Sequence, residues 1–239
     1  GISDVFAVPS HLHPTFAHYA RRDNYTMIDA GPEWGTGFLT FNENPSSTMS
    51  KTPALLKLFQ NKQFREAISY DVDRQTMCNM LALGLAKPSY GPLTPANTVF
   101  FDPKIRQYPF DPQRAKSMLL ALGCQPGTDG KLTYEGAPVK FTILVSKEGT
   151  SNQIATILVN DLEAIGVDAQ QSPVTFQALD TKIAAPPYDW QAVIMGFSAD
   201  AEPNDGADLW RTSSPSHIWW PKEPHPEFPW EAKIEDDFS

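Results

Sequence analysis

The segment between residues 139 and 196 constrains the fold more than any other part of the chain. Three apolar runs rich in β-branched or aromatic residues, at 139–145, 167–171 and 190–196, are separated by two stretches of helical periodicity. The first helical stretch ends at Gly166, and the second covers 176–184. Strands that alternate with helices pair in parallel through right-handed crossovers. The pattern predicts an α/β fold with a mixed, partly parallel central sheet flanked by helices.

Helix signals also precede this unit. Asn61 and Asp73 are N-cap candidates for two consecutive helices, and Asp111 with a following proline opens a third that ends at Gly123. Between them, residues 87–109 hold five prolines among aromatic residues, which predicts a long ordered loop. Apolar runs at 25–30 and 38–42 predict two strands near the N-terminus, and residues 230–234 resemble the start of a C-terminal helix.

Charge and motif content exclude several classes of function. The 28 acidic and 19 basic residues give a formal charge of −9, which repels the phosphates of nucleic acids. No apolar run approaches the roughly 18 residues that span a bilayer. The motifs of nucleophile elbows, P-loops, zincin helices and dinucleotide-binding glycines are missing from the sequence. We therefore predict no catalytic residues, no cofactor, no metal and no nucleic-acid partner.

Several polar and reactive residues favour structural interpretations. Asp71, Asp73 and Arg74 lie between two predicted helices, where capping and local pairing are simpler explanations than an acid pair for catalysis. Cys78 and Cys124 are 46 positions apart without a metal-binding or dithiol motif. A disulfide between them and two unpaired thiols are both open at this point.

In open α/β sheets, ligands bind beyond the carboxyl ends of the strands. Two loops occupy that position here, 147–150 after the first strand and 197–206 after the third. The second loop is dense in carboxylates and amides, which can orient a ligand amine or backbone. It is the principal candidate site.

Residues 64–74, with the sequence FREAISYDVDR, resemble a signature of the peptide/nickel-binding type of extracytoplasmic solute-binding protein, in which such a run joins two helices. The similarity continues at 84–88, at the helix start 110–112, at 161–166 and at 230–234. The resemblance implies a periplasmic-binding-protein-like fold and a two-lobed protein that encloses its ligand. It would deliver peptides or peptide-like ligands to the membrane permease of an ABC importer, without being an enzyme.

The resemblance also implies how the chain is divided. Residues 1–37 would form the edge of the first lobe, 38–50 the hinge crossing, and 51–239 a second, C-terminal ligand-binding lobe truncated at its end. We expect a monomer in the periplasm, or an extracytoplasmic protein held by a lipid anchor on an N-terminus that precedes this chain.

Peptide binders of the family commonly place an aspartate against the ligand's α-amino group, in the loop after the strand that 190–196 resembles. Asp200 matches that position, with Glu202 and Asn204 as further polar partners and with Trp34 and Phe197 as apolar walls. Two alternatives remain: a periplasmic hydrolase of peptides or glycans that uses the loop carboxylates, and an interaction module outside transport. Turnover of a peptide library would identify the first.

Overall fold

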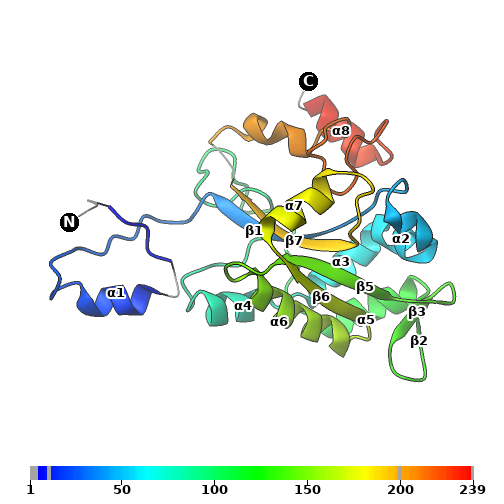
Figure 1. The fold of residues 1–239 in the computed structure, drawn as a ribbon, viewed down its shortest axis with the longest axis horizontal. Coiled ribbons are helices and arrows are strands. Elements are labelled where there is room, and N and C mark those ends of the chain that lie inside the picture. Colours follow the sequence, from blue (N-terminus) through cyan, green and yellow to red (C-terminus); the bar gives the residue numbers. More distant parts are fainter. Residues whose placement is uncertain (1–4, 10–11, 199–200, 238–239) are drawn as a thin grey trace.

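The computed structural model describes residues 5–9, 12–198 and 201–237 (Figure 1). The helices and strands in chain order are α1 His13–Tyr19, β1 Gly35–Phe41, the 3₁₀ helix η2 Thr48–Lys51, α2 Pro53–Gln60, α3 Lys62–Asp71, α4 Arg74–Leu81, α5 Pro112–Ala121, β2 Gln125–Pro126, β3 Leu132–Tyr134, β4 Ala137–Pro138, β5 Lys140–Ser146, α6 Ser151–Ala164, β6 Asp168–Val174, α7 Phe176–Ala184, β7 Ala192–Ser198, the 3₁₀ helix η3 Pro203–Leu209 and α8 Pro229–Asp237.

The central sheet has the strand order β1-β7-β5-β6. Strand β5 is parallel to both β6 and β7, as the alternating pattern predicted. Strand β1 comes from far earlier in the chain and pairs antiparallel with β7 along its whole length, from Gly35 opposite Ser198 to Phe41 opposite Ala192. The predicted α/β class with a mixed, partly parallel sheet is confirmed. A small separate sheet, β2-β3-β4, follows α5.

Helices cover both faces of the central sheet because the strand residues alternate between two apolar clusters. Ile143 and Val145 of β5 pack into a large core with residues of α2, α3, α5 and α6. Leu144 points to the opposite face, where it packs with Val193 of β7 and with Leu179 of α7. The result is a three-layer arrangement, with α7 on one side of the sheet and α2, α3, α5 and α6 on the other (Figure 1).

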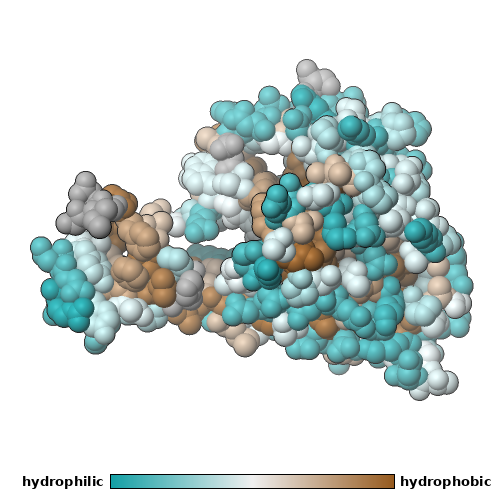
Figure 2. Space-filling view, viewed as in Figure 1, coloured by the Kyte–Doolittle hydropathy of each residue, from teal (hydrophilic) through white to brown (hydrophobic). Residues whose placement is uncertain are grey.

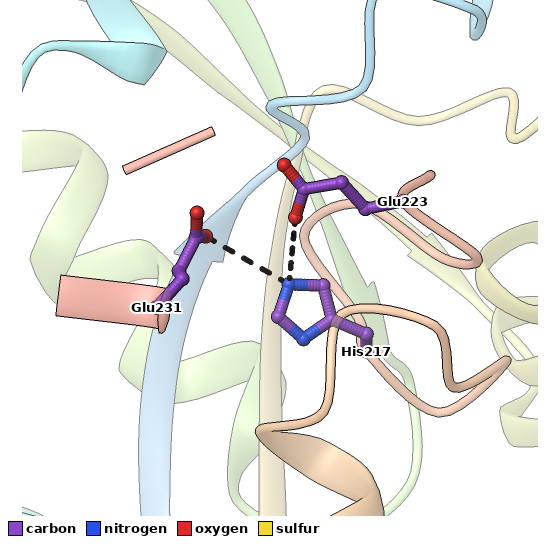
Figure 3. A group of neighbouring side chains, drawn as sticks. All are labelled: His217, Glu223 and Glu231. Atoms are coloured by element: carbon purple, nitrogen blue, oxygen red, sulfur yellow. Dashed lines mark ion pairs between the residues drawn. The ribbon is translucent and has the colours of Figure 1, made fainter. Parts of the chain in front are cut away.

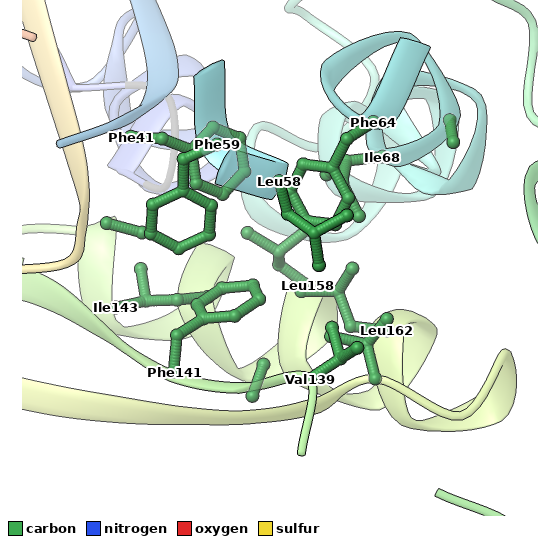
Figure 4. Packing of buried hydrophobic residues seen from close by; sticks show 14 of the residues in the cluster. Phe41, Leu58, Phe59, Phe64, Ile68, Val139, Phe141, Ile143, Leu158 and Leu162 are labelled. Carbon is green, nitrogen blue, oxygen red and sulfur yellow. The ribbon is translucent and has the colours of Figure 1, made fainter. Parts of the chain in front are cut away.

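Aromatic side chains hold the centre of the larger core. Phe41, Phe59, Phe64 and Phe141 are buried, and the ring centroids in contact lie 4.7–5.9 Å apart in tilted or edge-to-face pairs (Figure 4). Such geometries suit the ring quadrupoles and add to the free energy gained from burial. Because Phe41 ends β1 and Phe141 belongs to β5, this cluster fastens the edge strand to the middle of the sheet.

The predicted helix caps are present. The side chain of Asn61 accepts a hydrogen bond from the Gln63 amide at the start of α3, and that of Asp73 accepts one from the Thr76 amide of α4. Asp111 likewise caps α5. Each cap satisfies a backbone donor that the first helical turn leaves without a partner.

Asp71 departs from its predicted role in capping or local pairing. It ends α3 fully buried, and neither carboxylate oxygen has a hydrogen-bond partner within the described ranges. Arg74 instead donates to the carbonyl and hydroxyl oxygens of Ser69. Burial, and secondarily the nearby carboxylate of Asp161, raise the pKa of Asp71 to about 8.

The strand predicted at 25–30 was wrong. These residues adopt no regular structure, and Ile28 is 81% exposed, so the apolar run lacks both a partner strand and a core to pack on. The segment before β1 extends away from the body (Figure 1) and shows apolar surface (Figure 2). Val5 and Phe6 in this segment are exposed. The second predicted strand exists, but it begins at Gly35, three residues before the predicted run at 38–42.

Cys78 and Cys124 are both free thiols. Residues 87–109 contain neither helix nor strand and form the predicted long loop. Within the described ranges, no helix combines the length and the apolar character needed to cross a bilayer.

Candidate functional site

One edge of the sheet gathers the segments expected to meet a ligand. Parallel strands β5 and β7 both end there, at Ser146 and Ser198, and antiparallel β1 begins there at Gly35. The segment that enters β1 therefore lies beside the loop that leaves β7. The sequence predicted that loop 197–206 lies at the carboxyl edge of the sheet. It gave no signal that β1 pairs with β7 and brings the segment before Gly35 beside this loop.

A hollow of about 620 Å³ opens between these two strands. Its lining consists of the end of β7 and the start of β1 with the two residues before it: Glu33, Trp34, Gly35, Thr36, Gly37, Gly196, Phe197 and Ser198. Trp34 and Phe197, predicted as apolar walls from distant parts of the sequence, thus lie at one hollow.

Glycines leave one face of this strand pair almost without side chains. Gly35 and Gly37 occupy the same face of β1, since residues two apart point the same way. Gly196 lies directly opposite Gly37, and Ser198 lies opposite Gly35. At these paired positions no side chain on this face is larger than that of serine, so the backbone of both strand ends is open to a ligand there.

The two aromatic residues of the hollow differ in exposure and in the face they occupy. Trp34 is 40% exposed, and Phe197 is partly buried with its ring edge against Phe38, the centroids lying 5.7 Å apart. Phe197 and its cross-strand partner Thr36 point to the face opposite the glycines. An exposed tryptophan beside a fixed phenylalanine can contact the apolar parts of a ligand.

The predicted polar residues that the structure describes, unlike Trp34 and Phe197, are not found in the lining of the hollow. Asp200 lies outside the described residues. Glu202 and Asn204 are described and exposed, Asn204 at the start of η3, and neither is part of the hollow's lining. Their assignment as ligand-binding residues stays a prediction.

The long loop 87–109 supports both sides of the hollow. The Thr94 hydroxyl donates a hydrogen bond to the carbonyl of Glu33, on the segment that enters β1. The Asn97 side-chain amide donates to the carbonyl of Ala201, 3.1 Å away, on the segment that leaves β7. Both side chains are buried. The sequence predicts this loop but not the contacts of these two residues, because a lone Thr or Asn in a proline-rich stretch carries no spacing signal.

The other predicted loop, 147–150, uses its carboxylate for structure. Glu148 accepts hydrogen bonds from the Ser146 hydroxyl and from the Phe176 amide at the start of α7. The hydrogen bond from Ser146 lowers the pKa of Glu148, which therefore stays ionised. This carboxylate caps a helix.

A second polar group lies away from this edge, in the C-terminal segment. His217, Glu223 and Glu231 are buried, and one ligand-capable atom of each lies within 4.8 Å of the others (Figure 3). Burial lowers the pKa of His217 to about 4, raises that of Glu223 to about 7, and raises that of Glu231. The sequence carries no signal for this cluster, because its members are spaced irregularly among prolines.

Comparison with known proteins places the chain in a family. The model of the bacterial extracellular solute-binding proteins, family 5 middle region, matches residues 4–219. A probable ABC transporter-binding protein of Deinococcus radiodurans is 27% identical over 201 residues, which are 81% of this chain and 32% of that protein. The oligopeptide-binding protein AppA of Bacillus subtilis is 25% identical over 171 residues, which are 69% of this chain and 31% of that protein.

Solved structures share the fold. AppA of Bacillus subtilis in complex with a nonapeptide superposes with a TM-score of 0.72 at 20% identity, covering 98% of this chain and 46% of that chain. The periplasmic binding protein MelB of Agrobacterium fabrum in complex with stachyose gives a TM-score of 0.73 at 18% identity, covering 96% of this chain and 36% of that one.

The chain spans about a third of the length of the curated relatives it matches and less than half of these solved structures. The family match nevertheless extends over most of the chain, and it includes the strands that form the hollow. The chain therefore belongs to the bacterial extracellular solute-binding proteins of family 5.

Proposed function

We propose that this chain forms one wall of the ligand cleft in an extracytoplasmic binding protein, which captures peptides or peptide-like ligands between two lobes and delivers them to the permease of an ABC importer. Family membership supports the role, and the hollow between β1 and β7 supports the location of the wall. The protein would act as a monomer in the periplasm, or outside the cell membrane on a lipid anchor.

The observation that carries the ligand class is the face formed by Gly35, Gly37 and Gly196. Glycine lets another backbone approach closely, because there is no Cβ to hold it off. An extended peptide has the complementary form, a narrow backbone with donors and acceptors along it. The exposed side chain of Trp34 would contact its apolar side chains, whereas Phe197 points to the other face of the strand pair and stays a predicted wall.

We assign Asp200 to the ligand's α-ammonium group, with Glu202 and Asn204 as partners for backbone polar groups. Two observations support the assignment of Asp200: in the sequence it comes two residues after the end of β7, and it matches the family position given above. A carboxylate in a closed cleft that holds little water binds an ammonium group strongly.

The division into lobes is part of the proposal: 1–37 in the first lobe, 38–50 crossing between lobes and 51–239 in the second. The exposed apolar side chains of the segment before β1 support contact of that segment with the first lobe. Since β1 pairs with β7 along its whole length, the crossing segment would be tied directly to the sheet of the second lobe.

The experiment is a Gly37→Val substitution in the full-length protein. A Cβ at position 37 would have the Met195 carbonyl at 3.7 Å as its nearest neighbour, an ordinary contact, so the strand should accept valine without strain. The added methyl groups would nonetheless stand on the open backbone face. Native mass spectrometry of the unchanged protein identifies the ligand, and calorimetry then measures its affinity for each variant.

We expect Gly37→Val to weaken binding at least tenfold with an unchanged melting temperature. Gln170→Val, an equivalent β-branched change at an exposed position of β6, is the matched control and should leave affinity unchanged. Binding of Gly37→Val within twofold of the unchanged protein would refute the assignment of the face. A bound oligosaccharide in place of a peptide would keep the transport role and refute the ligand class.

A further inference from the structure

The buried group of His217, Glu223 and Glu231 lies in the C-terminal segment, apart from the hollow between β1 and β7. His217 and Glu223 come from irregular chain after η3, and Glu231 from the first turn of α8. Figure 3 shows both carboxylates turned toward the imidazole ring. All three side chains are at most 1% exposed, so whatever satisfies their polar atoms is inside the protein.

The hydrogen bond of Nδ1, the ring nitrogen that points away from the two carboxylates, fixes the tautomer of the imidazole. His217 Nδ1 lies 3.1 Å from the carbonyl oxygen of Leu209, and because a carbonyl can only accept, Nδ1 is the donor. In the neutral ring the lone pair is then on Nε2, which faces the two carboxylates. Histidines that bind metals are commonly held in this way, with the outer N–H donated to a carbonyl.

In each carboxylate, one oxygen accepts a hydrogen bond from a backbone amide and the other oxygen faces His217. Glu223 Oε1 accepts from the Glu227 amide at 3.1 Å, and Glu231 Oε2 accepts from the Phe228 amide at 3.0 Å. The remaining oxygens are those nearest His217 Nε2: Glu223 Oε2 at 3.5 Å and Glu231 Oε1 at 3.9 Å. Glu231 Oε1 has one weak partner, the Trp219 indole N–H at 3.3 Å.

Two of the three inward atoms have no partner. His217 Nε2 and Glu223 Oε2 are buried without a hydrogen bond to any described residue. Leaving such groups without a partner destabilises the folded state, and more so when the group is charged. Arg65, a cation on α3, is bonded to Glu43 and to the carbonyl of Phe59, so its hydrogen bonds go elsewhere.

The two separations from His217 Nε2 fit a small divalent ion, and the two carboxylate oxygens lie within 4.8 Å of each other. Nitrogen and oxygen ligands bind Zn²⁺ at about 2.0–2.2 Å, which places two ligands of a tetrahedral ion about 3.4 Å apart. The distances of 3.5 and 3.9 Å from Nε2 are close to that value. One imidazole with two carboxylates and no thiolate suits Zn²⁺ among the common ions, and excludes the sulfur-rich sites of Cu(I).

We propose that His217 Nε2, Glu223 Oε2 and Glu231 Oε1 form a structural binding site for a divalent transition-metal ion of the Zn²⁺ type, with water as the fourth ligand. The ion would join α8 to the loop before it. That loop is in turn bonded to the body of the protein, because the Glu43 amide donates to the Trp219 carbonyl at 2.8 Å. By joining α8 to this loop, the metal ion would fasten the C-terminal segment to the chain that follows β1.

The test uses the protein purified without a polyhistidine tag, with His11, His13 and His18 replaced by glutamine to remove surface binding near the N-terminus. After treatment with a chelator and its removal, Zn²⁺ is titrated by calorimetry and the melting temperature is measured at each metal concentration. We expect one ion per chain and a rise of several degrees in melting temperature at saturation.

Glu223→Gln keeps the size of the side chain and should weaken Zn²⁺ binding at least tenfold. The matched control is Glu227→Gln together with His225→Gln, two exposed residues of the same segment, which should bind as the parent does. Equal loss in the control, or no Zn²⁺ binding by the parent at a hundredfold excess, would overturn the proposal. In the latter case a proton shared between Glu223 and His217 would account for the cluster.

A second measurement avoids the risk that a buried substitution unfolds the protein. In the chain with its five native histidines labelled with ¹⁵N, saturating Zn²⁺ should shift the Nε2 resonance of His217, with Nδ1 still protonated. An unchanged His217 resonance at saturation would refute the site, whatever the variants show.

Discussion

Asp71 should make the stability of this protein fall as the pH rises. Its carboxyl group is fully buried with no partner among the described residues, and its pKa is raised from the ordinary value of 3.8 to about 8. The folded state therefore keeps the proton to a higher pH than the unfolded state does. The contribution to stability is complete below pH 3.8, declines as the pH rises, and is lost above about pH 8.

The size of the effect follows from the pKa. Each unit corresponds to about 1.4 kcal/mol, so the shift sets a ceiling of about 4 kcal/mol on the stability lost between pH 5 and pH 8. Movement of side chains and entry of water lower the penalty of a buried charge. We expect about 2 kcal/mol over this range, for Asp71 alone.

The perturbation is Asp71→Asn, which keeps the shape and removes the ionisation. Urea denaturation at pH 5 and pH 8 gives the free energy of unfolding for each protein. The free energy of unfolding of Asp71→Asn minus that of the unchanged protein should be about 2 kcal/mol larger at pH 8 than at pH 5. Glu43 and Glu223 are buried carboxyl groups whose pKa values are also raised. Both proteins contain them, so their contributions to the pH dependence cancel in this difference.

Asp180→Asn, at an exposed position of α7, changes the net charge by the same amount and is the control. The difference in free energy of unfolding between Asp180→Asn and the unchanged protein should be the same at pH 5 and pH 8. If Asp71→Asn behaves in the same way, the carboxyl group ionises freely in the folded state, and the reasoning from burial is refuted.

Three further predictions concern single sites. Asp111→Ala should lower the free energy of unfolding by about 1 kcal/mol in urea, as lost N-caps do, while ligand affinity measured by calorimetry stays unchanged. Gly166→Ala should cost more than about 2 kcal/mol, since residue 166 has φ +97° and a Cβ would lie 2.8 Å from the Gly130 carbonyl oxygen, whereas Gly136→Ala, with φ +78° and open space, should cost about half as much. Asp200→Asn in the full-length protein should cost about 2–5 kcal/mol of affinity for a ligand with a free amine. Acetylating that amine should weaken binding to the unchanged protein but not to the variant, and binding by Asp200→Asn within threefold would place the anchor elsewhere.

Local signals predicted the regular elements well. The caps Asn61, Asp73 and Asp111 and the alternating pattern at 139–196 specify helices and strands through neighbouring residues, and the structure has these elements. The run at 25–30 has the composition of a strand, but strand formation needs a partner, and none of the described residues supplies one.

Partners distant in sequence could not be predicted. The antiparallel pairing of Gly37 with Gly196 creates the open face of the hollow, yet no local pattern connects two glycines 159 positions apart. The burial of Asp71 is a similar case, since an acidic residue at the end of a helix reads as a cap until its surroundings are known. Both depend on tertiary contacts.

The pairing of β1 with β7 also determines an order of events during synthesis. About 150 residues separate Phe41 from Ala192, and β1 has no other strand partner among the described residues. At roughly 5–20 residues per second, a ribosome needs on the order of 10–30 s to add them. During that interval the glycine-rich strand must stay unpaired while later segments form their own contacts. A chaperone that binds nascent chains would find this strand accessible longer than any other in the sheet.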